Sequence, residues 1–553
     1  GGPGASGLAS ADPYAEAMHE SVLENFDIVF FDQRGVGQSA ELQCIDAAAA
    51  YYQADWNTDT PEQRAEFIEA ARTFADDCRA EMNADAVLPY MGTSQAIEDL
   101  EAFWRAIADE QMWLYGESYG TQFAQTYAAA YPEHLAGLIL DGTVDLTLDS
   151  IEFYHQQTQA FSDVLIATLD ACNADPLCAA DFDGDARAFY DDFTDELETA
   201  PIIVDFPLPT GEIVPRPLTL SNFETVVSAN LYSETGRAFL LRLMAAASFG
   251  DSLPLVREAY VDLALDPVTL EAVYDPTWSD AMFYAVECND YGFSDATGEE
   301  GAQSFIDAGV QASAGIPYLS SIMFGDMPCL FWPGNPPSER PAPLIADGIP
   351  TMVLGATLDP ATPVGNGEAV YGRLADGYLF TQEGGPHVIY GRGLDCPDDA
   401  VTDFLVDGQM PDERENSCEG GVADEYAPVS ANHIDDFVDV LDMMWAVDTE
   451  IFYLPEYFNW DLESVTSVGC PFGGVLTFEA TSIGESLVLD NCAFIDGFIL
   501  TGTGEFDYNS GMFTMYVQAS GAAEGNLTYT ASEDNLALTV TGDYAGETID
   551  LVG

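Results

Sequence analysis

Ser118 is the residue whose surroundings best suit covalent chemistry. It lies in the run Gly116-Glu117-Ser118-Tyr119-Gly120, a Gly-x-Ser-x-Gly pattern. An apolar stretch over residues 112–115 precedes the run, and a helix-like stretch over residues 121–131 follows it. A strand, a sharp turn and a helix hold a serine in strained backbone, where its hydroxyl can attack a carbonyl. The bare pattern also occurs in ordinary surface turns, but these flanking elements favour the nucleophile.

A nucleophilic serine needs a base, and the chain has five histidines: His19, His134, His155, His387 and His433. In hydrolases built around such a turn, an acid and then the histidine follow the serine along the chain. His387 comes after a strand-like segment at residues 378–381 and a Gly-Gly-Pro turn, whereas His433 lies in an acidic stretch. We therefore favour His387 as the base over His433.

The acid that orients the base is expected at the end of the strand before the histidine. Residues 350–355 form a short apolar run, and Asp359 follows it, 28 residues before His387. In a chain with 95 acidic residues a lone aspartate means little, so its place at a strand end is what selects it. A carboxylate there would hold the imidazole tautomer and stabilise its positive form.

Two backbone N–H groups are predicted to hold the negative oxygen that forms during attack. The chain opens with Gly1-Gly2-Pro3-Gly4, a glycine-rich loop from which Gly2 would supply one N–H. Tyr119, the residue after the serine, would supply the other. This chemistry needs no cofactor. We also expect no metal, because the sequence lacks the Cys-x-x-Cys pairs that are typical of zinc sites.

Five motifs, in order, carry a resemblance to a known family. They are Gly1-Gly2-Pro3-Gly4, Asp32-Gln33-Arg34-Gly35, the run around Ser118, the segment from Asp359 to Pro363, and the glycine-rich turn before His387. Together they resemble the proline iminopeptidase and tripeptidyl aminopeptidase family of serine peptidases, with the secreted tripeptidyl aminopeptidase branch the nearer match. The resemblance covers about residues 1–420. It implies an α/β-hydrolase fold and peptide substrates.

The resemblance carries two further expectations. The family motif normally has a histidine before Gly-Gly-Pro-Gly, so we expect a sequence that is incomplete at its N-terminus and lacks the preceding strands. Carboxylates in the cap are expected to capture the free α-ammonium of the substrate, and Glu287 and Asp290 are the candidates. With 95 acidic residues in the chain, a solvated or structural role for each is the commoner alternative.

The elements that position these residues divide the chain into four parts. Residues 1–145 are expected to form the first part of an α/β-hydrolase core, with a strand over residues 26–31 and a helix from Thr93 or Ser94 to Ile107. Residues 146–344 show helical spacing and are predicted to be an inserted helical cap. Residues 345–446 return to the core. Residues 447–553 contain short alternating runs separated by Gly, Asn and Asp, which predicts an all-β module of antiparallel hairpins.

Composition limits the partners and the compartment. The chain has 14 basic residues, all arginine, against 95 acidic ones, for a net charge of −81. Such a surface repels nucleic acid and anionic lipid, so neither is expected as a partner. Disorder is excluded because 48% of the residues are hydrophobic. Adaptation to high salt and the ordinary acidity of a secreted protein both remain open as causes.

The cysteines point to an oxidising compartment. Their even number and wide spacing suit disulfides, and we propose pairing in consecutive order: Cys44, Cys78, Cys172, Cys178, Cys288, Cys329, Cys396, Cys418, Cys470 and Cys492. The sequence has no apolar run of 18 or more residues, so we expect no transmembrane segment. A secreted, cell-surface or periplasmic location follows.

Three functions remain on this evidence. The first is an aminopeptidase that releases tripeptides or other short units from free N-termini. The second is a carboxylesterase or lipase-like hydrolase on the same scaffold, because the triad alone does not separate peptides from esters. The third is a non-catalytic binding protein. The module at 447–553 is either a passive appendage or a contact site for a surface or polymer.

The charge generates the first testable prediction. If the acidity is an adaptation to salt, the melting temperature should rise steeply between dilute buffer and molar chloride. The reason is that the Debye length falls from about 30 Å at 0.01 M to about 3 Å at 1 M, which screens the repulsion between carboxylates. Differential scanning calorimetry across this range checks it. A melting temperature that does not change with salt concentration would favour the interpretation that the protein is simply acidic and secreted.

Overall fold

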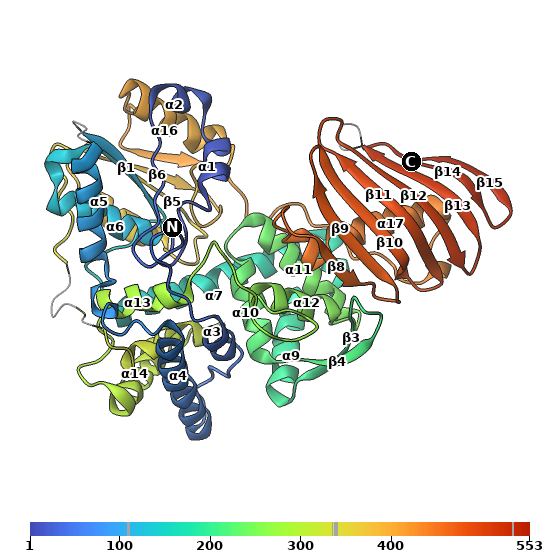
Figure 1. Cartoon of the computed structure of the whole chain (residues 1–553), viewed down its shortest axis with the longest axis horizontal. Helices are drawn as coiled ribbons and strands as arrows, with labels where there is room; N and C mark the ends of the chain where they lie inside the picture. The colour runs from blue at the N-terminus through green and yellow to red at the C-terminus, as the bar shows by residue number, and fades with distance from the viewer. Residues whose placement is uncertain (108–110, 335, 337–340, 533–535) are drawn as a thin grey trace. The chain divides into compact units, whose positions relative to one another are not determined.

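The computed structural model describes residues 1–107, 111–334, 336, 341–532 and 536–553. The chain divides into two units (Figure 1). The first comprises Gly1–Ala174, Val227–Leu240 and Glu271–Glu425. The second comprises Asp175–Val226, Leu241–Leu270 and Tyr426–Gly553. These bounds differ from the predicted four-part division, because parts of the predicted cap pack with the C-terminal residues.

The first unit holds most of the helices and one parallel sheet. Its elements are α1 (Ala11–Ala17), α2 (Glu20–Asn25), α3 (Ile45–Tyr52), α4 (Pro61–Met82), α5 (Thr93–Ile107), β1 (Met112–Glu117), α6 (Tyr119–Ala130), β2 (Leu135–Asp141), α7 (Ser150–Ala174), α13 (Asp280–Asp290), α14 (Gly298–Ala312), β5 (Thr351–Ala356), α15 (Val364–Tyr371), β6 (Gly377–Gln382), α16 (Asp395–Asp407) and β7 (Glu415–Cys418). The predicted helix to Ile107 is formed as α5, and the predicted apolar runs at 350–355 and 378–381 form β5 and β6.

The parallel sheet has the strand order β1-β2-β5-β6-β7. Its central strands, β2 and β5, are almost entirely apolar and buried, as expected where helices cover both faces of a sheet. Leu138 and Val353 face the core beneath α5 and α6, whereas Met352 and Leu354 face the core beneath α16. Since all five strands are parallel, their carboxyl ends meet at one edge of the sheet, where α/β proteins place their sites.

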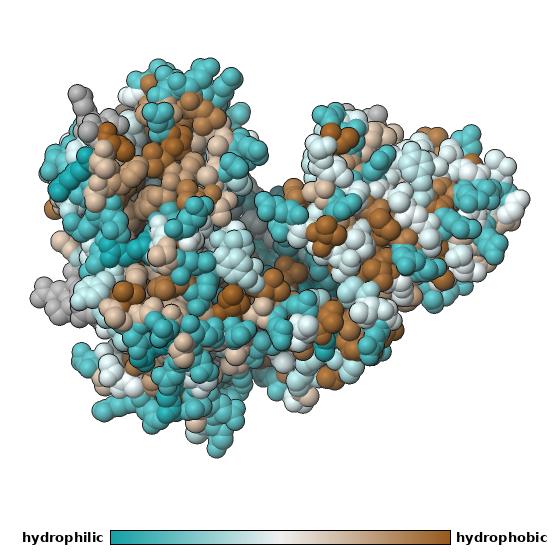
Figure 2. All heavy atoms as spheres, viewed as in Figure 1, coloured by the Kyte–Doolittle hydropathy of each residue, from teal (hydrophilic) through white to brown (hydrophobic). Residues whose placement is uncertain are grey.

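The segment at residues 26–31 differs from the prediction. Residues 26–31, predicted to be a strand, form no β-ladder. They line, together with β1, a cavity of about 920 Å³ whose walls include Phe30, Phe103 and Trp113. Figure 2 shows apolar side chains gathered around a hollow over α1, α2 and β1. Residues 26–31 therefore border this cavity and do not pair as a strand.

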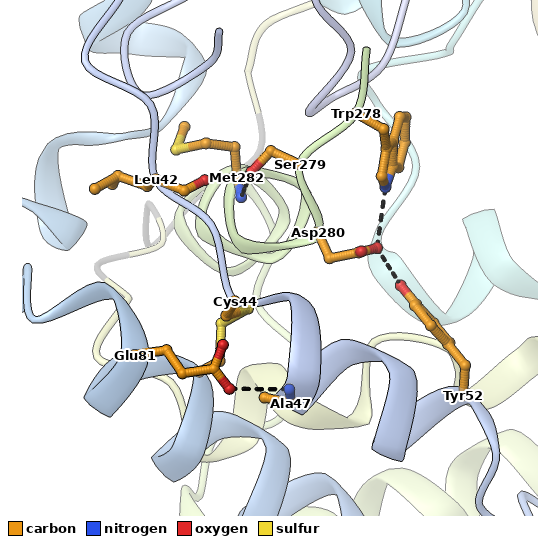
Figure 3. The surroundings of a disulfide bond; sticks show 10 residues. Leu42, Cys44, Ala47, Tyr52, Glu81, Trp278, Ser279, Asp280 and Met282 are labelled. Atoms are coloured by element: carbon orange, nitrogen blue, oxygen red, sulfur yellow. Dashed lines mark hydrogen bonds between the residues drawn. A yellow bond between two sulfur atoms is a disulfide. The ribbon is translucent and has the colours of Figure 1, made fainter. Parts of the chain in front are cut away.

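A disulfide and two carboxylates brace the helices beside the sheet (Figure 3). Cys44, at the start of α3, is bonded to Cys78 of α4. Glu81 of α4 accepts the N–H of Ala47 at 3.0 Å, which satisfies one free donor in the first turn of α3. Asp280 accepts the Tyr52 hydroxyl at 2.8 Å. Since Asp280 is the first residue of α13, this brace positions that helix.

The other cysteines are also oxidised. Cys288 is bonded to Cys329, Cys396 to Cys418, and Cys470 to Cys492, so each of these bridges joins cysteines that are consecutive in the sequence. Cys172 and Cys178 are disulfide-bonded as well. Among the described residues, no helix is long and apolar enough to cross a membrane.

The second unit is built on an antiparallel sheet. Its elements are α8 (Pro176–Asp181), α9 (Ala186–Thr199), β3 (Ile202–Pro207), β4 (Ile213–Leu218), α10 (Leu220–Asn230, which runs into the first unit), α11 (Glu234–Ser248, which begins there), α12 (Leu253–Asp262), α17 (Val440–Phe452), α18 (Pro455–Phe458), β8 (Thr466–Gly469), β9 (Val475–Thr481), β10 (Gly484–Ile495), β11 (Phe498–Asp507), β12 (Met512–Gly521), β13 (Gly525–Ser532), β14 (Leu538–Tyr544) and β15 (Glu547–Val552). Strands β8 to β15 pair in sequence order, so the predicted hairpins form one eight-stranded meander.

Two features of this unit were not predicted. A hairpin, β3–β4, lies inside the segment predicted to be helical. Strand β4 contains two prolines, which are tolerated because a two-stranded ribbon has open edges. In addition, α17 packs on the C-terminal sheet through Met444 and Val447, in one core with Phe478. The predicted boundary at residue 447 therefore falls inside a helix that belongs with the sheet.

Candidate active site

Ser118 lies in a strained turn between β1 and α6. Its φ is +51° and its ψ is −126°, in the left-handed half of the map that favours glycine. The turn is tight because the backbone folds closely on itself: a Cβ added to Gly116 would lie 2.3 Å from the carbonyl oxygen of Gly120. The glycine at 116 is therefore required by space, and the turn holds Ser118 at the carboxyl edge of the sheet.

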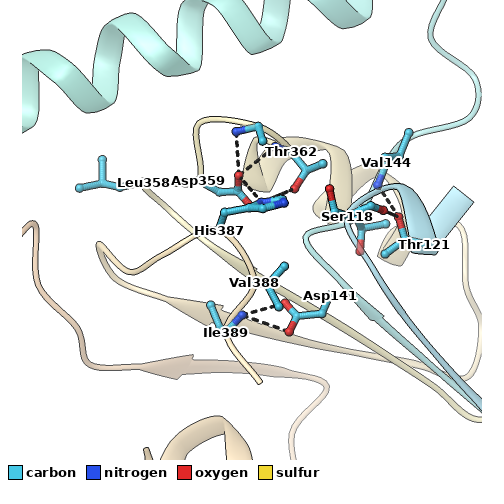
Figure 4. A network of polar contacts seen from close by, with 12 residues as sticks. Ser118, Thr121, Asp141, Val144, Leu358, Asp359, Thr362, His387, Val388 and Ile389 are labelled. Atoms are coloured by element: carbon cyan, nitrogen blue, oxygen red, sulfur yellow. Dashed lines mark hydrogen bonds and ion pairs between the residues drawn. The ribbon is translucent and has the colours of Figure 1, made fainter. Parts of the chain in front are cut away.

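Hydrogen bonds fix this turn to the neighbouring strand. The Ser118 N–H donates to the carbonyl of Asp141 at 2.8 Å. The carbonyl of Ser118 accepts the hydroxyl of Thr121 at 2.7 Å. In Figure 4 the Ser118 side chain faces the imidazole of His387.

Asp359 is a buried carboxylate that accepts several hydrogen bonds. It lies in the loop after β5, only 2% exposed. It accepts the N–H groups of Ala361 and Thr362 at 2.9 and 2.8 Å, and the Thr362 hydroxyl at 2.9 Å. Nδ1 of His387 lies 2.9 Å from both of its oxygens. These contacts fix the position of the carboxylate, which in turn holds the imidazole in one orientation.

The charge around His387 favours its protonated form. Burial by itself lowers the pKa of His387, but the charge and hydrogen bond of Asp359 raise it. The charges of Asp141 and Glu117 raise it further, so the pKa lies above its ordinary value. Because Asp359 holds Nδ1, the other ring nitrogen, Nε2, is the one left to exchange a proton with a serine hydroxyl.

Asp141 holds the turn that follows His387, a role that the sequence analysis missed. This fully buried residue ends β2, and its carboxylate accepts the N–H groups of Ile389 at 3.0 Å and Tyr390 at 2.8 Å. Between them and His387 lies Val388, with a φ of +70° that is unfavourable for a β-branched residue. The two bonds stabilise this strained turn, and Figure 4 shows the N–H of Ile389 directed at the Asp141 carboxylate. The sequence does contain a signal for this role, because Asp141 is an acidic residue at the end of an otherwise apolar strand.

Burial also disfavours the charge of Asp141. It raises the pKa of this carboxyl to about 6, although the N–H groups of Tyr390 and Ile389 act in the opposite direction. The charge of Glu117, its partner across the β1–β2 pair, adds to the increase. Two acids thus lie beside the imidazole in addition to Asp359.

Of the two predicted oxyanion donors, Tyr119 directly follows the serine in the chain. Tyr119 is the first residue of α6, so its N–H belongs to the turn whose donors have no intrahelical partner. The chain start passes close by, since a Cβ added to Gly120 would lie 3.4 Å from the nitrogen of Gly1. Gly2 follows in that loop. Asp32 fixes the loop by accepting the hydroxyl of Ser6 at 2.7 Å.

A polar network extends from Tyr119 to Asp290. The Tyr119 hydroxyl lies 2.6 Å from the hydroxyl of Thr93. Thr93 donates its N–H to Asp290 at 3.0 Å, and Gln122 donates to the same carboxylate at 2.8 Å. Glu287, one turn earlier on α13, is 7% exposed. Asp290 is thus held close to the serine turn by structural partners, and both predicted acids lie on a helix of the first unit.

The charge beside His387 generates a second prediction. Asp141→Asn should lower the pKa of His387, because it removes a negative charge that favours the imidazolium. NMR titration of the histidine ring protons measures this without any substrate. Asp448→Asn is the matched control, since Asp448 is a buried acid whose pKa burial also raises to about 6, in the second unit. An unchanged His387 titration in Asp141→Asn would contradict this account of the site.

Two family models match the chain. The model described as alpha/beta hydrolase fold matches residues 1–180, which contain the serine turn. The model described as TAP-like protein matches residues 318–418, which contain Asp359 and His387. The two matches therefore cover both halves of the parallel sheet.

Curated relatives agree with these models. Serine protease Hip1 of Mycobacterium tuberculosis strain H37Rv is 29% identical over 422 residues, which cover 74% of this chain and 78% of that protein. Tripeptidyl aminopeptidase of Streptomyces lividans is 25% identical over 431 residues, or 76% and 75% of the two chains. Carboxylesterase B of M. tuberculosis H37Rv is 29% identical over 425 residues, or 74% and 77%. Together with the parallel sheet, these matches show that the chain has the α/β-hydrolase fold and is similar to serine peptidases of that fold.

Proposed function

We propose that the protein is an aminopeptidase that releases tripeptides or other short units from free peptide N-termini. Ser118 would be the nucleophile, His387 the base and Asp359 the orienting acid. The observation that supports this triad best is the bond from Nδ1 of His387 to buried Asp359, at 2.9 Å, beside a serine in a strained turn.

The proposed reaction has two steps with one covalent intermediate. Ser118 Oγ attacks the substrate carbonyl while Nε2 of His387 takes its proton, and the imidazolium that forms is stabilised by Asp359. The N–H groups of Tyr119 and Gly2 hold the oxyanion, and α6 adds the positive end of its dipole there. His387 then gives the proton to the leaving amine. Water hydrolyses the acyl-enzyme by the same route in reverse.

The preference for a free amine would come from the acids on α13. We propose that Glu287 and Asp290 provide the negative potential that attracts the substrate ammonium. Asp290 already accepts bonds from Thr93 and Gln122, so its position is fixed and its charge acts from a rigid site. The distance between this charge and Ser118 would set how many residues are released.

An esterase is the alternative function, and one observation favours it. Carboxylesterase B matches the chain as extensively as the two peptidases do. An esterase needs the same serine, base and oxyanion donors but no site for an ammonium group. The acids on α13 therefore separate the two proposals.

We further propose that the enzyme acts outside the cytoplasm. Its ten cysteines are all oxidised, as is usual for secreted proteins. Contact of the C-terminal sheet with a surface or polymer stays a prediction.

A third prediction tests the nucleophile and the amine site together. Ser118→Ala should lower kcat by roughly 10⁶-fold on a tripeptide-releasing peptide, because the triad fails as a unit. Glu287→Gln and Asp290→Asn should raise KM for that peptide by roughly tenfold to a hundredfold, the usual value of a charged contact. Mass spectrometry of the fragments gives the length released.

The matched substrates are the N-acetylated peptide and a neutral p-nitrophenyl ester. Cleavage of both should be unaffected by the two α13 substitutions, and the acetylated peptide should be a poor substrate for the native enzyme. The esterase proposal is correct if the native enzyme cleaves the ester well but cleaves the free and the acetylated peptide equally poorly. Full activity in Ser118→Ala would overturn both proposals.

A further inference from the structure

Arg237 is a fully buried arginine that contacts the loop carrying Asp359 of the proposed triad. It is in the first turn of α11 and has no exposed surface. Its three nitrogens each donate to a different backbone carbonyl: Nε to Leu231 at 2.9 Å, Nη1 to Val422 at 2.9 Å, and Nη2 to Leu358 at 2.7 Å. One side chain therefore ties together three segments that are far apart in the sequence.

Two of these segments lead directly to the proposed catalytic residues. Leu358 precedes Asp359 on the loop after β5 (Figure 4). Leu231 precedes Tyr232, whose carbonyl accepts the backbone N–H of His387 at 2.7 Å. The Tyr232 ring also meets the imidazole edge-on, with centroids 5.4 Å apart. Arg237 thus contacts one loop directly and reaches the other through a single residue.

The charge of Arg237 also acts on this site. Burial lowers its pKa to about 10, while the charges of Glu234 and Asp359 favour its protonated form. It therefore keeps its positive charge at neutral pH. A buried cation is costly unless it has partners, and here three backbone carbonyl oxygens accept its hydrogen bonds. The positive charge of Arg237 and the negative charge of Asp359 attract each other.

We propose that Arg237 is a positioning residue for catalysis: its guanidinium fixes the Asp359 and His387 loops relative to each other and holds a positive charge behind Asp359. This inference deepens the proposed function and rests on it. Arg237 lies in the segment Val227–Leu240, between the two halves of the core in sequence. The segment thereby supplies part of the catalytic framework.

Only arginine fits this role. Its planar group presents donors in several fixed directions, so it can reach three carbonyls at once. A lysine keeps the charge but offers a single ammonium on a flexible stem. A glutamine keeps some donors and loses the charge. The pair of substitutions therefore separates geometry from charge.

The test compares Arg237→Lys and Arg237→Gln with Arg242→Lys. Arg242 is the matched control: it lies further along α11, is 4% exposed, and donates to the carbonyls of Ala427 and Pro428 and to Glu450. All of these partners are in the second unit. Four quantities are measured on each folded protein: the melting temperature, kcat and KM on a free-amine peptide, and the pKa of His387 by NMR titration.

All three variants should lose thermal stability, but only the Arg237 variants should lose catalysis. Both should lower kcat by at least about tenfold with little change in KM, since small misplacement of reacting groups is costly. Arg237→Gln should also raise the pKa of His387, because a cation that opposes the imidazolium is removed. Arg237→Lys should shift it less.

Equal kcat losses in Arg237→Lys and Arg242→Lys, with an unchanged His387 titration, would overturn the inference. Failure of both Arg237 variants to fold, when Arg242→Lys folds, would also overturn it, because Arg237 would then be a folding residue. The titration needs no substrate. A shifted His387 pKa in a protein without aminopeptidase activity would therefore refute the proposed function and leave the positioning role intact.

Discussion

The burial of the Asp359 carboxylate is the constraint on which the first unit depends. A charge removed from water costs several kcal/mol unless donors replace the lost hydration. At Asp359 the donors come from its own loop and from the ring of His387. The loops after β5 and β6 must therefore end at a fixed separation, which the parallel register of these strands provides. Asp141 then holds the loop after β6, Arg237 holds the loop after β5, and the serine turn is anchored on β2.

Much of this arrangement could be predicted from the sequence, and the reason is local. Ser118, Asp359 and His387 each follow a short apolar run, and the carboxyl ends of parallel strands converge. The C-terminal meander could be predicted because its strands pair with their neighbours in sequence. The contacts of Arg237 and Asp141 could not, since their partners lie 121 and 248 residues away. Nor could the packing of α17 on the sheet, because its apolar face resembles that of any core helix.

The arginines show how a strongly acidic chain uses few cations. Only 14 basic residues face 95 acidic ones, yet three of the arginines are buried in α11 and α12. Arg237, Arg242 and Arg257 all donate to backbone carbonyls, and the last two also pair with glutamates. These cations stabilise the interior, so the surface is left with an excess of carboxylates. Such a field attracts cationic peptide ends and weakens as salt is added.

The central claim is that Ser118, His387 and Asp359 act as one unit, and a double-mutant cycle tests it most directly. The rate at which a fluorophosphonate labels Ser118 is measured for native protein, His387→Ala, Asp359→Ala and the double variant. If the three residues form a unit, His387→Ala labels as slowly as the double variant, because Asp359 acts only through the imidazole. Independent losses that multiply in the double variant, or labelling of another residue, would contradict the account.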